Sequence, residues 1–171
     1  SSSSAASDVY KRQGTVGESY CYEGVETHCI RAGTANFAIE AAMTEAQCHQ
    51  AMKLGRDSVE KAMSAQADIF VAGEMGIGNT CSASALACLL LNEDAEQLTG
   101  IGTGIDAQKL KYKKQVIDRA IALHQPHVKE DAFKIMTAVG GLEIAAMTGA
   151  YIRCAQLGMP MVIDGFISSV A

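Results

Sequence analysis

The chain has 171 residues, of which 49% are hydrophobic and two are proline, so it is long enough and apolar enough to form a folded domain. Its formal net charge is −5 and aromatic residues make up 5%, which disfavours nucleic-acid binding because a phosphate backbone is usually met by a basic face. The longest apolar stretch, residues 85–91, is too short to cross a bilayer. We therefore expect a cytoplasmic protein that uses neither nucleic acid nor membrane as a partner.

The chain contains six cysteines, and no two of them have the Cys-x-x-Cys spacing of a zinc or redox site. Cys48 lies next to His49, but neighbouring residues on a helix or strand point away from each other. The four histidines show no partnered arrangement. The sequence therefore predicts reduced thiols, no metal site and no cofactor.

The two ends of the chain differ from its middle. Residues 1–13 contain a serine run without apolar periodicity, so we interpret them as a non-native or library-derived leader. At the other end, the sequence stops just after a predicted strand and its turn. We expect residues 14–171 to form a partial nucleotide-binding domain, an internal fragment of a longer protein.

The first predicted elements are a helix over 43–67, a short buried strand over 68–73, a glycine turn and a second helix over 81–92. Thr44 has the spacing of a capping box with Gln47, which marks the start of the first helix.

A turn-rich connector follows over 93–106, and a helix after it is expected to end at Pro126. Two more helices are predicted over 129–140 and 141–158, and a second buried strand over 159–165. Strands and helices alternate without a hairpin signal. The sequence therefore predicts an α/β fold, with a three-layer, mostly parallel, Rossmann-like sheet between flanking helices, here truncated.

The stretch Gly-Glu-Met-Gly-Ile-Gly-Asn-Thr at 73–80 follows the first predicted strand. Gly76 and Gly78 leave the backbone open to a close approach, and the amides that begin the next helix favour a phosphate. Asn79 and Thr80 are candidates to cap that helix. The stretch lacks both the Lys-Ser/Thr pair of a P-loop and the Gly-x-Gly-x-x-Gly spacing of a dinucleotide site. It is either a cradle for a phosphate monoester or a tight turn whose glycines serve packing alone.

Three charged residues have two interpretations each. Glu74 would repel a phosphate but accept hydrogen bonds from ribose hydroxyls, or it is an exposed loop residue. Lys113 belongs to a basic helix face, or it turns inward to a phosphate because it lies four residues before Ile117. Asp164 forms a turn before Gly165, or it faces a ligand.

Several motifs resemble one family in their order and spacing. The family is nicotinate-nucleotide:dimethylbenzimidazole phosphoribosyltransferase, which assembles the lower nucleotide loop of cobalamin, and the resemblance covers nearly all of 14–171. The matching motifs are GTANFA at 33–38, AMT at 42–44, GEMGIGNT at 73–80, GTGID at 102–106, the segment 113–120, VGGLEIAAMTGA at 139–150 and DGF at 164–166.

The resemblance implies a homodimeric enzyme that binds nicotinate mononucleotide and a benzimidazole-type base. It assigns the ribose to Glu74, the flat base to a pocket lined by Met75, and the phosphate to Lys113. The expected substrate-binding residues are Glu74, Met75, Gly76, Ile77, Gly78, Asn79, Thr80, Gly102, Lys113, Asp164 and Gly165.

The implied reaction moves the 5-phosphoribosyl group from nicotinate mononucleotide to 5,6-dimethylbenzimidazole and gives α-ribazole 5'-phosphate and nicotinate. In the family the general base is a glutamate of a C-terminal Gly-Glu-Gly-Thr motif, which does not occur in this sequence. We expect that base beyond Ala171, and neither Glu74 nor Glu143 is assigned its role. The alternatives are a noncatalytic phosphoribosyl- or nucleotide-binding module, and an oxidoreductase or kinase that uses the glycine turn for another nucleotide.

Overall fold

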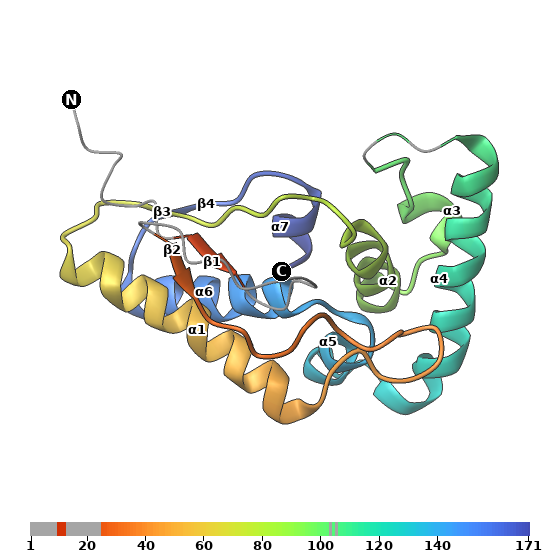
Figure 1. Cartoon of the computed structure of the whole chain (residues 1–171), viewed down its shortest axis with the longest axis horizontal. Coiled ribbons are helices and arrows are strands. Elements are labelled where there is room, and N and C mark those ends of the chain that lie inside the picture. The colour runs from red at the N-terminus through yellow and green to blue at the C-terminus, as the bar shows by residue number, and fades with distance from the viewer. Residues whose placement is uncertain (1–9, 13–24, 103, 105) are drawn as a thin grey trace.

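The computed structural model describes residues 10–12, 25–102, 104 and 106–171 (Figure 1). Helices dominate this part of the chain, and the strands are short. In chain order the elements are β1 (Tyr10–Arg12), β2 (Val25–Thr27), α1 (Glu45–Ser64), β3 (Phe70–Val71), α2 (Thr80–Leu91), α3 (Ala95–Leu98), α4 (Ala107–Val128), α5 (Ala132–Val139), α6 (Leu142–Leu157), β4 (Met161–Val162) and α7 (Phe166–Val170).

The strands pair in parallel, as the sequence predicts, but they form two separate two-stranded sheets within the described residues. β1 pairs with β2, and β3 pairs with β4 with Val71 opposite Val162. The prediction that β3 and β4 are buried is wrong for this structure, since Val71 is 59% exposed and Val162 is 42% exposed. Phe70 of β3, by contrast, is partly buried against a small core cluster that includes Val59. One three-layer sheet is therefore not present in the described part of the chain.

Helices α1 and α6 lie against each other, and each leads into one strand of the β3–β4 pair (Figure 1). Two glycines allow the close approach. A Cβ on Gly55 of α1 would lie 1.8 Å from the carbonyl oxygen of Ala146, and a Cβ on Gly149 of α6 would lie 2.1 Å from that of Met52. The backbones of the two helices are in direct contact, so this packing fixes how β3 and β4 meet.

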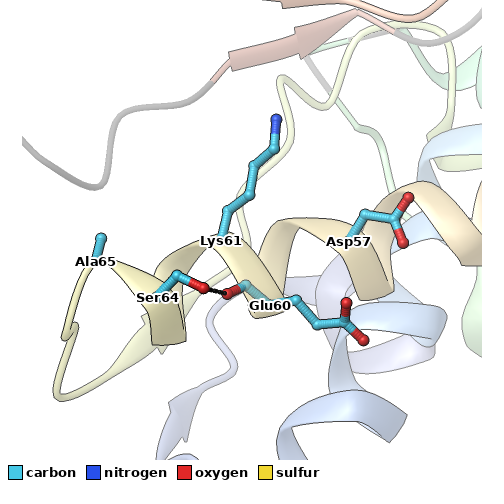
Figure 2. A pocket seen from close by; sticks show the side chains of 5 residues that line it. All are labelled: Asp57, Glu60, Lys61, Ser64 and Ala65. Carbon is cyan, nitrogen blue, oxygen red and sulfur yellow. Dashed lines mark hydrogen bonds between the residues drawn. The ribbon is translucent and has the colours of Figure 1, made fainter.

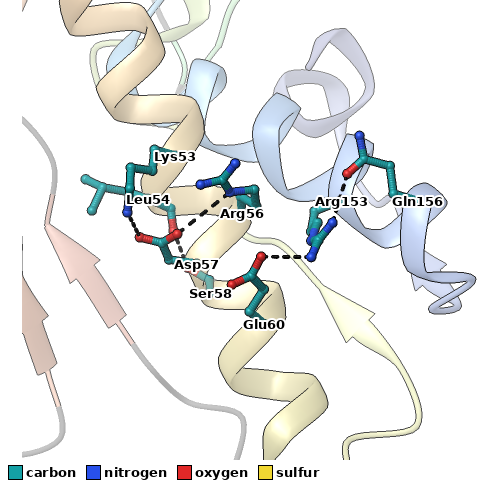
Figure 3. A network of polar contacts seen from close by, with 8 residues as sticks. All are labelled: Lys53, Leu54, Arg56, Asp57, Ser58, Glu60, Arg153 and Gln156. Carbon is teal, nitrogen blue, oxygen red and sulfur yellow. Dashed lines mark hydrogen bonds and ion pairs between the residues drawn. The ribbon is translucent and has the colours of Figure 1, made fainter.

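The start of α1 follows the predicted capping box. The Thr44 hydroxyl accepts a hydrogen bond from the Gln47 amide at 3.2 Å, and the Gln47 side chain accepts one from the Thr44 amide at 2.9 Å. Farther along, Arg153 of α6 pairs with Glu60 of α1 at 2.9 Å, beside the exposed Lys53–Asp57 pair within α1 (Figure 3). These surface pairs contribute little beyond the apolar and glycine contacts.

The centre of the molecule is α2, which is buried continuously from Ser82 to Cys88 and is packed by α4, α5 and α7. Its small side chains permit this close packing on several sides. His124 of α4 is also buried, and its Nε2 lies 2.8 Å from the carbonyl oxygen of Phe37. This contact with the backbone ties α4 to the segment before α1. No described helix combines the length and apolar character needed to span a bilayer.

Most helix boundaries agree with the sequence, and three details differ. The connector 93–106 contains the short helix α3, and the turn at Asp164–Gly165 opens directly into α7. Pro126 lies inside α4, which ends two residues later at Val128. A proline in the last turn removes one donor without breaking the earlier hydrogen bonds of the helix, so it does not mark the end. Gly158 closes α6 in a left-handed conformation, as predicted.

Burial raises the pKa of several cysteine thiols. It raises the pKa of Cys48 to about 11, and together with Asp118 and Asp94 it raises that of Cys88 to about 11. Burial also raises the pKa of Cys154, whereas Cys29 is exposed. The folded state holds these protons more tightly than an unfolded chain, whose thiol pKa is about 8.5. The contribution of the buried thiols to the free energy of unfolding should therefore be fully present below that pH. That contribution should be lost as the pH rises toward 11.

We expect a disulfide reagent such as dithionitrobenzoate at pH 8 to label Cys29 rapidly in the native protein. The buried thiols should react only after unfolding in urea, since both access and ionisation are suppressed. A Cys21→Ser background removes the cysteine that lies outside the described residues. Rapid labelling of Cys48 or Cys88 in the native state would contradict the burial described here.

Candidate functional site

The predicted phosphate-binding loop, residues 73–80, begins one residue beyond the end of β3 and ends at the first residue of α2. Gly76 and Gly78 have φ of +71° and +81°, a region that favours glycine. Met75 and Ile77, which alternate with them, are 81% and 73% exposed. The loop therefore presents two large apolar side chains to solvent on a backbone that glycine holds in an open conformation.

Glu74 turns back onto its own loop. Its Oε2 accepts hydrogen bonds from the Gly76 amide and, at 2.7 Å, from Asn79 Nδ2. The prediction that the Asn79 side chain caps α2 is wrong, because Asn79 occupies the N-cap position but makes no capping hydrogen bond with its side chain. The side-chain amide of Asn79 donates to the charged carboxylate of Glu74 instead. The first turn of α2 is thus left without a side-chain cap, and its amides remain available to an anion.

Lys113 reaches this loop from α4, in agreement with the inward-turning one of its two interpretations. Its ammonium group is buried, with the residue 8% exposed, and donates hydrogen bonds at 3.0 Å to Thr80 Oγ1 and at 3.0 Å to the carbonyl oxygen of Gly100. Gly102 borders the same group, since a Cβ there would lie 3.2 Å from Thr80 Oγ1 and 3.6 Å from Lys113 Nζ. Gly100 and Gly102 of the 93–106 connector are therefore part of the site.

The charge of Lys113 is not neutralised within the described residues, where both of its hydrogen-bond partners are neutral oxygens. A lysine ammonium has three donors, so one remains. Burying an unpaired cation is unfavourable, and a bound anion would remove that penalty. The same charge acts on Cys81, whose pKa is raised by burial and lowered in smaller part by Lys113. The site therefore has the electrostatics of an anion pocket.

Glu143 lies in the first turn of α6, where the charge of Glu74 acts on it. Burial raises its pKa, and the charge of Glu74 raises it further, while hydrogen bonds from its own backbone amide and from Asn79 lower it. Sequence motifs placed Glu143 in the matching family segment, but not beside Glu74 and Asn79. The one sequence signal for its location is its place at a helix start after two glycines.

Asp164 and Gly165 begin the turn from β4 to α7. Because β3 and β4 are parallel, this turn starts at the same edge as the 73–80 loop. The Asp164 side chain is exposed, its carbonyl oxygen accepts a hydrogen bond from the Ser168 hydroxyl, and Gly165 has φ of +96°. These contacts establish the turn-forming role, and a ligand-facing role for the Asp164 carboxylate stays a prediction.

A shallow surface hollow lies elsewhere, along the last turns of α1 (Figure 2). Its lining includes two carboxylates and a lysine, and it contains none of the predicted site residues. In the same helix the Ser64 hydroxyl donates to the Glu60 carbonyl oxygen at 2.9 Å. Among the described residues there is also no group of three or more His, Cys, Asp or Glu side chains that could hold a metal ion. The loop and Lys113 remain the candidate site.

A sequence model described as Phosphoribosyltransferase matches residues 6–171. The chain belongs to this phosphoribosyltransferase family. The match starts inside the predicted leader 1–13, whose non-native origin stays a prediction.

Similar proteins of the phosphoribosyltransferase family carry the name of the family that the sequence motifs resemble. The chain is 50% identical over 148 residues to the nicotinate-nucleotide--dimethylbenzimidazole phosphoribosyltransferase of Pseudomonas aeruginosa strain LESB58, covering 86% of this chain and 42% of that protein. It is 50% identical over 158 residues to the protein of the same name from Pseudomonas fluorescens strain SBW25, covering 92% and 45%. The crystal structure of CobT from Thermus thermophilus matches with a TM-score of 0.87 and 36% identity, covering 95% of this chain and 48% of that one. The chain thus spans less than half the length of these relatives.

Proposed function

We propose that the protein containing this chain transfers the 5-phosphoribosyl group of nicotinate mononucleotide to 5,6-dimethylbenzimidazole in cobalamin biosynthesis. The products are α-ribazole 5'-phosphate and nicotinate. Family membership supports the reaction class, and the buried, unneutralised ammonium of Lys113 beside an uncapped helix start carries the argument for a phosphate-bearing substrate.

The phosphate would bind between Lys113, Thr80 and the first amides of α2. Lys113 supplies its third donor, and Thr80 accepts from Lys113 and so keeps its own hydroxyl proton for a phosphate oxygen. Gly102 leaves space at this point that a larger residue would fill. These contacts are charge-assisted hydrogen bonds, which are the stronger kind.

The ribose would bind to Glu74, next to the phosphate. A carboxylate accepts hydrogen bonds only, which suits the two adjacent hydroxyls of the sugar. Glu74 already accepts from Asn79, and an ionised carboxylate has four acceptor positions, so capacity remains. Met75, which is exposed, would line the flat pocket for the aromatic base together with Ile77.

In the reaction, one imidazole nitrogen of the base forms a bond to the anomeric carbon while the bond to nicotinate breaks. The bonding electron pair leaves with the cationic ring nitrogen of nicotinate, so no acid is needed. Attack from the opposite face converts the β linkage to α. A general base takes the proton from the second imidazole nitrogen, and we propose that this base is a glutamate beyond Ala171.

The short, exposed strands support a larger sheet in the complete protein. We propose that β3 and β4 are part of a larger parallel sheet flanked by helices in the complete protein, which accounts for their exposed apolar side chains. We also propose a cytoplasmic homodimer.

The test is a product assay of the full-length protein from the reading frame that carries this chain. Incubation with nicotinate mononucleotide and dimethylbenzimidazole should give α-ribazole 5'-phosphate and nicotinate in equal amounts by liquid chromatography. Tight binding of nicotinate mononucleotide without either product would indicate the noncatalytic binding module instead. Preferential binding of ATP or a dinucleotide would oppose both proposals.

Replacing Glu74 by glutamine should weaken nicotinate mononucleotide binding by about 10-fold, because an amide replaces one charged acceptor by a donor. Calorimetric titration measures the change. Ribose 5-phosphate should lose affinity to the same extent, whereas inorganic phosphate should not. Equal losses for inorganic phosphate would mean that Glu74 acts on the phosphate side of the site.

A further inference from the structure

One of the two groups that hold the Lys113 ammonium is a backbone carbonyl in a glycine-rich segment. That carbonyl belongs to Gly100, which is exposed. Gly102 and Gly104, which follow it, have positive φ of +57° and +102°. Glycine has more backbone freedom than any other residue, so this side of the segment contributes little to fixing the Gly100 carbonyl. Its position is therefore set mainly by the residues that precede it.

Ser84 of α2 supplies a polar contact on that preceding side. Its side chain is fully buried, and its hydroxyl donates to the Leu98 carbonyl oxygen at 3.0 Å. Between Leu98 and Gly100 lies Thr99, which is buried and extended, with φ of −109° and ψ of 110°. The Thr99 hydroxyl has no hydrogen-bond partner in the described part of the chain. Ser84, and not Thr99, therefore links this segment to α2 through a side-chain hydrogen bond.

The spacing along the helix matches the spacing along the segment. Thr80 and Ser84 are four residues apart on α2, so they share a face and lie about 6 Å apart along the helix axis. Leu98 and Gly100 are two residues apart in an extended segment, a span of roughly 6.6 Å. Ser84 holds the Leu98 carbonyl at one step. At the other step, Lys113 donates to both the Gly100 carbonyl and the Thr80 hydroxyl.

We propose that Ser84 is a positioning residue for the phosphate pocket, because it fixes the segment 98–100 and, through the carbonyl of Gly100, the ammonium of Lys113. The inference rests on the proposed function for the identity of the ligand. Ser84 touches no substrate in this scheme, since it lies one turn beyond the first residue of α2. Without its hydroxyl, the Leu98 carbonyl loses a partner and the segment loses an anchor. The ammonium then gains other orientations, and ordering it around a phosphate costs more entropy.

The first experiment compares Ser84→Ala with Ser82→Ala in the full-length protein. Ser82 is the matched control because it is also buried in α2, but it lies two residues before Ser84 and so faces another side of the helix. Calorimetry measures the affinity for nicotinate mononucleotide and for nicotinate riboside, which lacks the phosphate. Ser84→Ala should weaken binding of the mononucleotide about 5-fold and leave that of the riboside within about twofold. Ser82→Ala should change neither affinity.

A double variant separates positioning from a general structural role. If Ser84 acts through Lys113, adding Ser84→Ala to Lys113→Met should cause no further loss of affinity for nicotinate mononucleotide, because the ammonium that it positions is already absent. Ser84→Cys, which has a similar size and a weaker donor, replaces Ser84→Ala if alanine prevents folding. A further loss in the double variant would overturn the inference. Equal losses for mononucleotide and riboside in the single variant would do the same.

A third measurement needs no ligand. The carbonyl ¹³C signals of Leu98 and Gly100 in the labelled full-length protein should both shift in Ser84→Ala, and both should be unchanged in Ser82→Ala. A shift confined to Leu98 would mean that the Gly100 carbonyl is held without Ser84, against the inference. If both signals shift while the wild type fails to bind nicotinate mononucleotide, the proposed function fails and the link between Ser84 and Gly100 is supported.

Discussion

Replacing Gly55 by alanine should destabilise the protein by about 3 kcal/mol or more, at the upper end of the cost of overpacking a core. The new Cβ would lie 1.8 Å from the carbonyl oxygen of Ala146, and backbone cannot move aside as a flexible side chain can. Helix propensity alone predicts the opposite, a gain of roughly 1 kcal/mol on exchanging glycine for alanine within a helix. The sign of the change, measured as the shift of the urea midpoint by circular dichroism, therefore decides which effect wins.

A matched control is Gly73→Ala. A Cβ at Gly73 would have no atom within 4 Å, and its φ does not lie in the positive region, so stability should change by no more than about 0.5 kcal/mol. Gly149→Ala probes the same contact from α6, with the carbonyl oxygen of Met52 at 2.1 Å. The two substitutions together should cost less than the sum of the single effects because they separate the same pair of helices. A Gly55→Ala protein as stable as wild type would disprove the close backbone contact.

Replacing Lys113 by methionine should reduce the affinity for nicotinate mononucleotide by roughly 10- to 100-fold, as expected for one charge-assisted hydrogen bond. Affinity for the corresponding riboside, which has no phosphate, should be nearly unchanged. The melting temperature of the Lys113→Met protein should not fall, since the substitution removes a buried ammonium whose described partners are neutral oxygens. Calorimetry with both ligands and a thermal melt separate the two effects.

Lys111→Met is the control, because Lys111 lies on the same helix and is exposed. It should bind nicotinate mononucleotide within about twofold of wild type, apart from screening effects of net charge. An equal loss of affinity for the phosphorylated and unphosphorylated ligands in Lys113→Met would mean that Lys113 supports the fold of the loop and does not bind phosphate. Equal losses in both lysine variants would indicate a general effect of charge.

The sequence predicts those features that depend on local chemistry. The capping box at Thr44 and the terminal glycine at 158 locate two helix ends, because each acts on residues within one helical turn. The spacing from Lys113 to Ile117 makes an inward turn one of two interpretations, since residues four apart share a helix face, and the burial of Lys113 agrees with it. The parallel pairing of β3 and β4 follows from the alternation of strands and helices.

Other features depend on contacts between distant segments and could not be predicted in this way. Asn79 is a good cap by type, but the carboxylate of Glu74 competes for its amide and wins because a charged acceptor is stronger. Burial and then the charge of Glu74 raise the pKa of Glu143, which lies on another helix, so the spacing of the two residues in the sequence carries no signal. The exposure of Val71 and Val162 depends on what covers the strands, which an apolar run cannot reveal.

The adjacency of Asn79 and Thr80 has a geometric consequence. Their side chains contact opposite charges, Asn79 contacting Glu74 and Thr80 contacting Lys113, so two consecutive residues hold the negative and the positive group of the site. Consecutive Cα atoms are about 3.8 Å apart, and this distance does not stretch. Under the proposed function, this short spacing suits a sugar joined to a single phosphate. A ligand with a diphosphate would place its second phosphorus beyond this span, and selection by length would need no clash with any side chain.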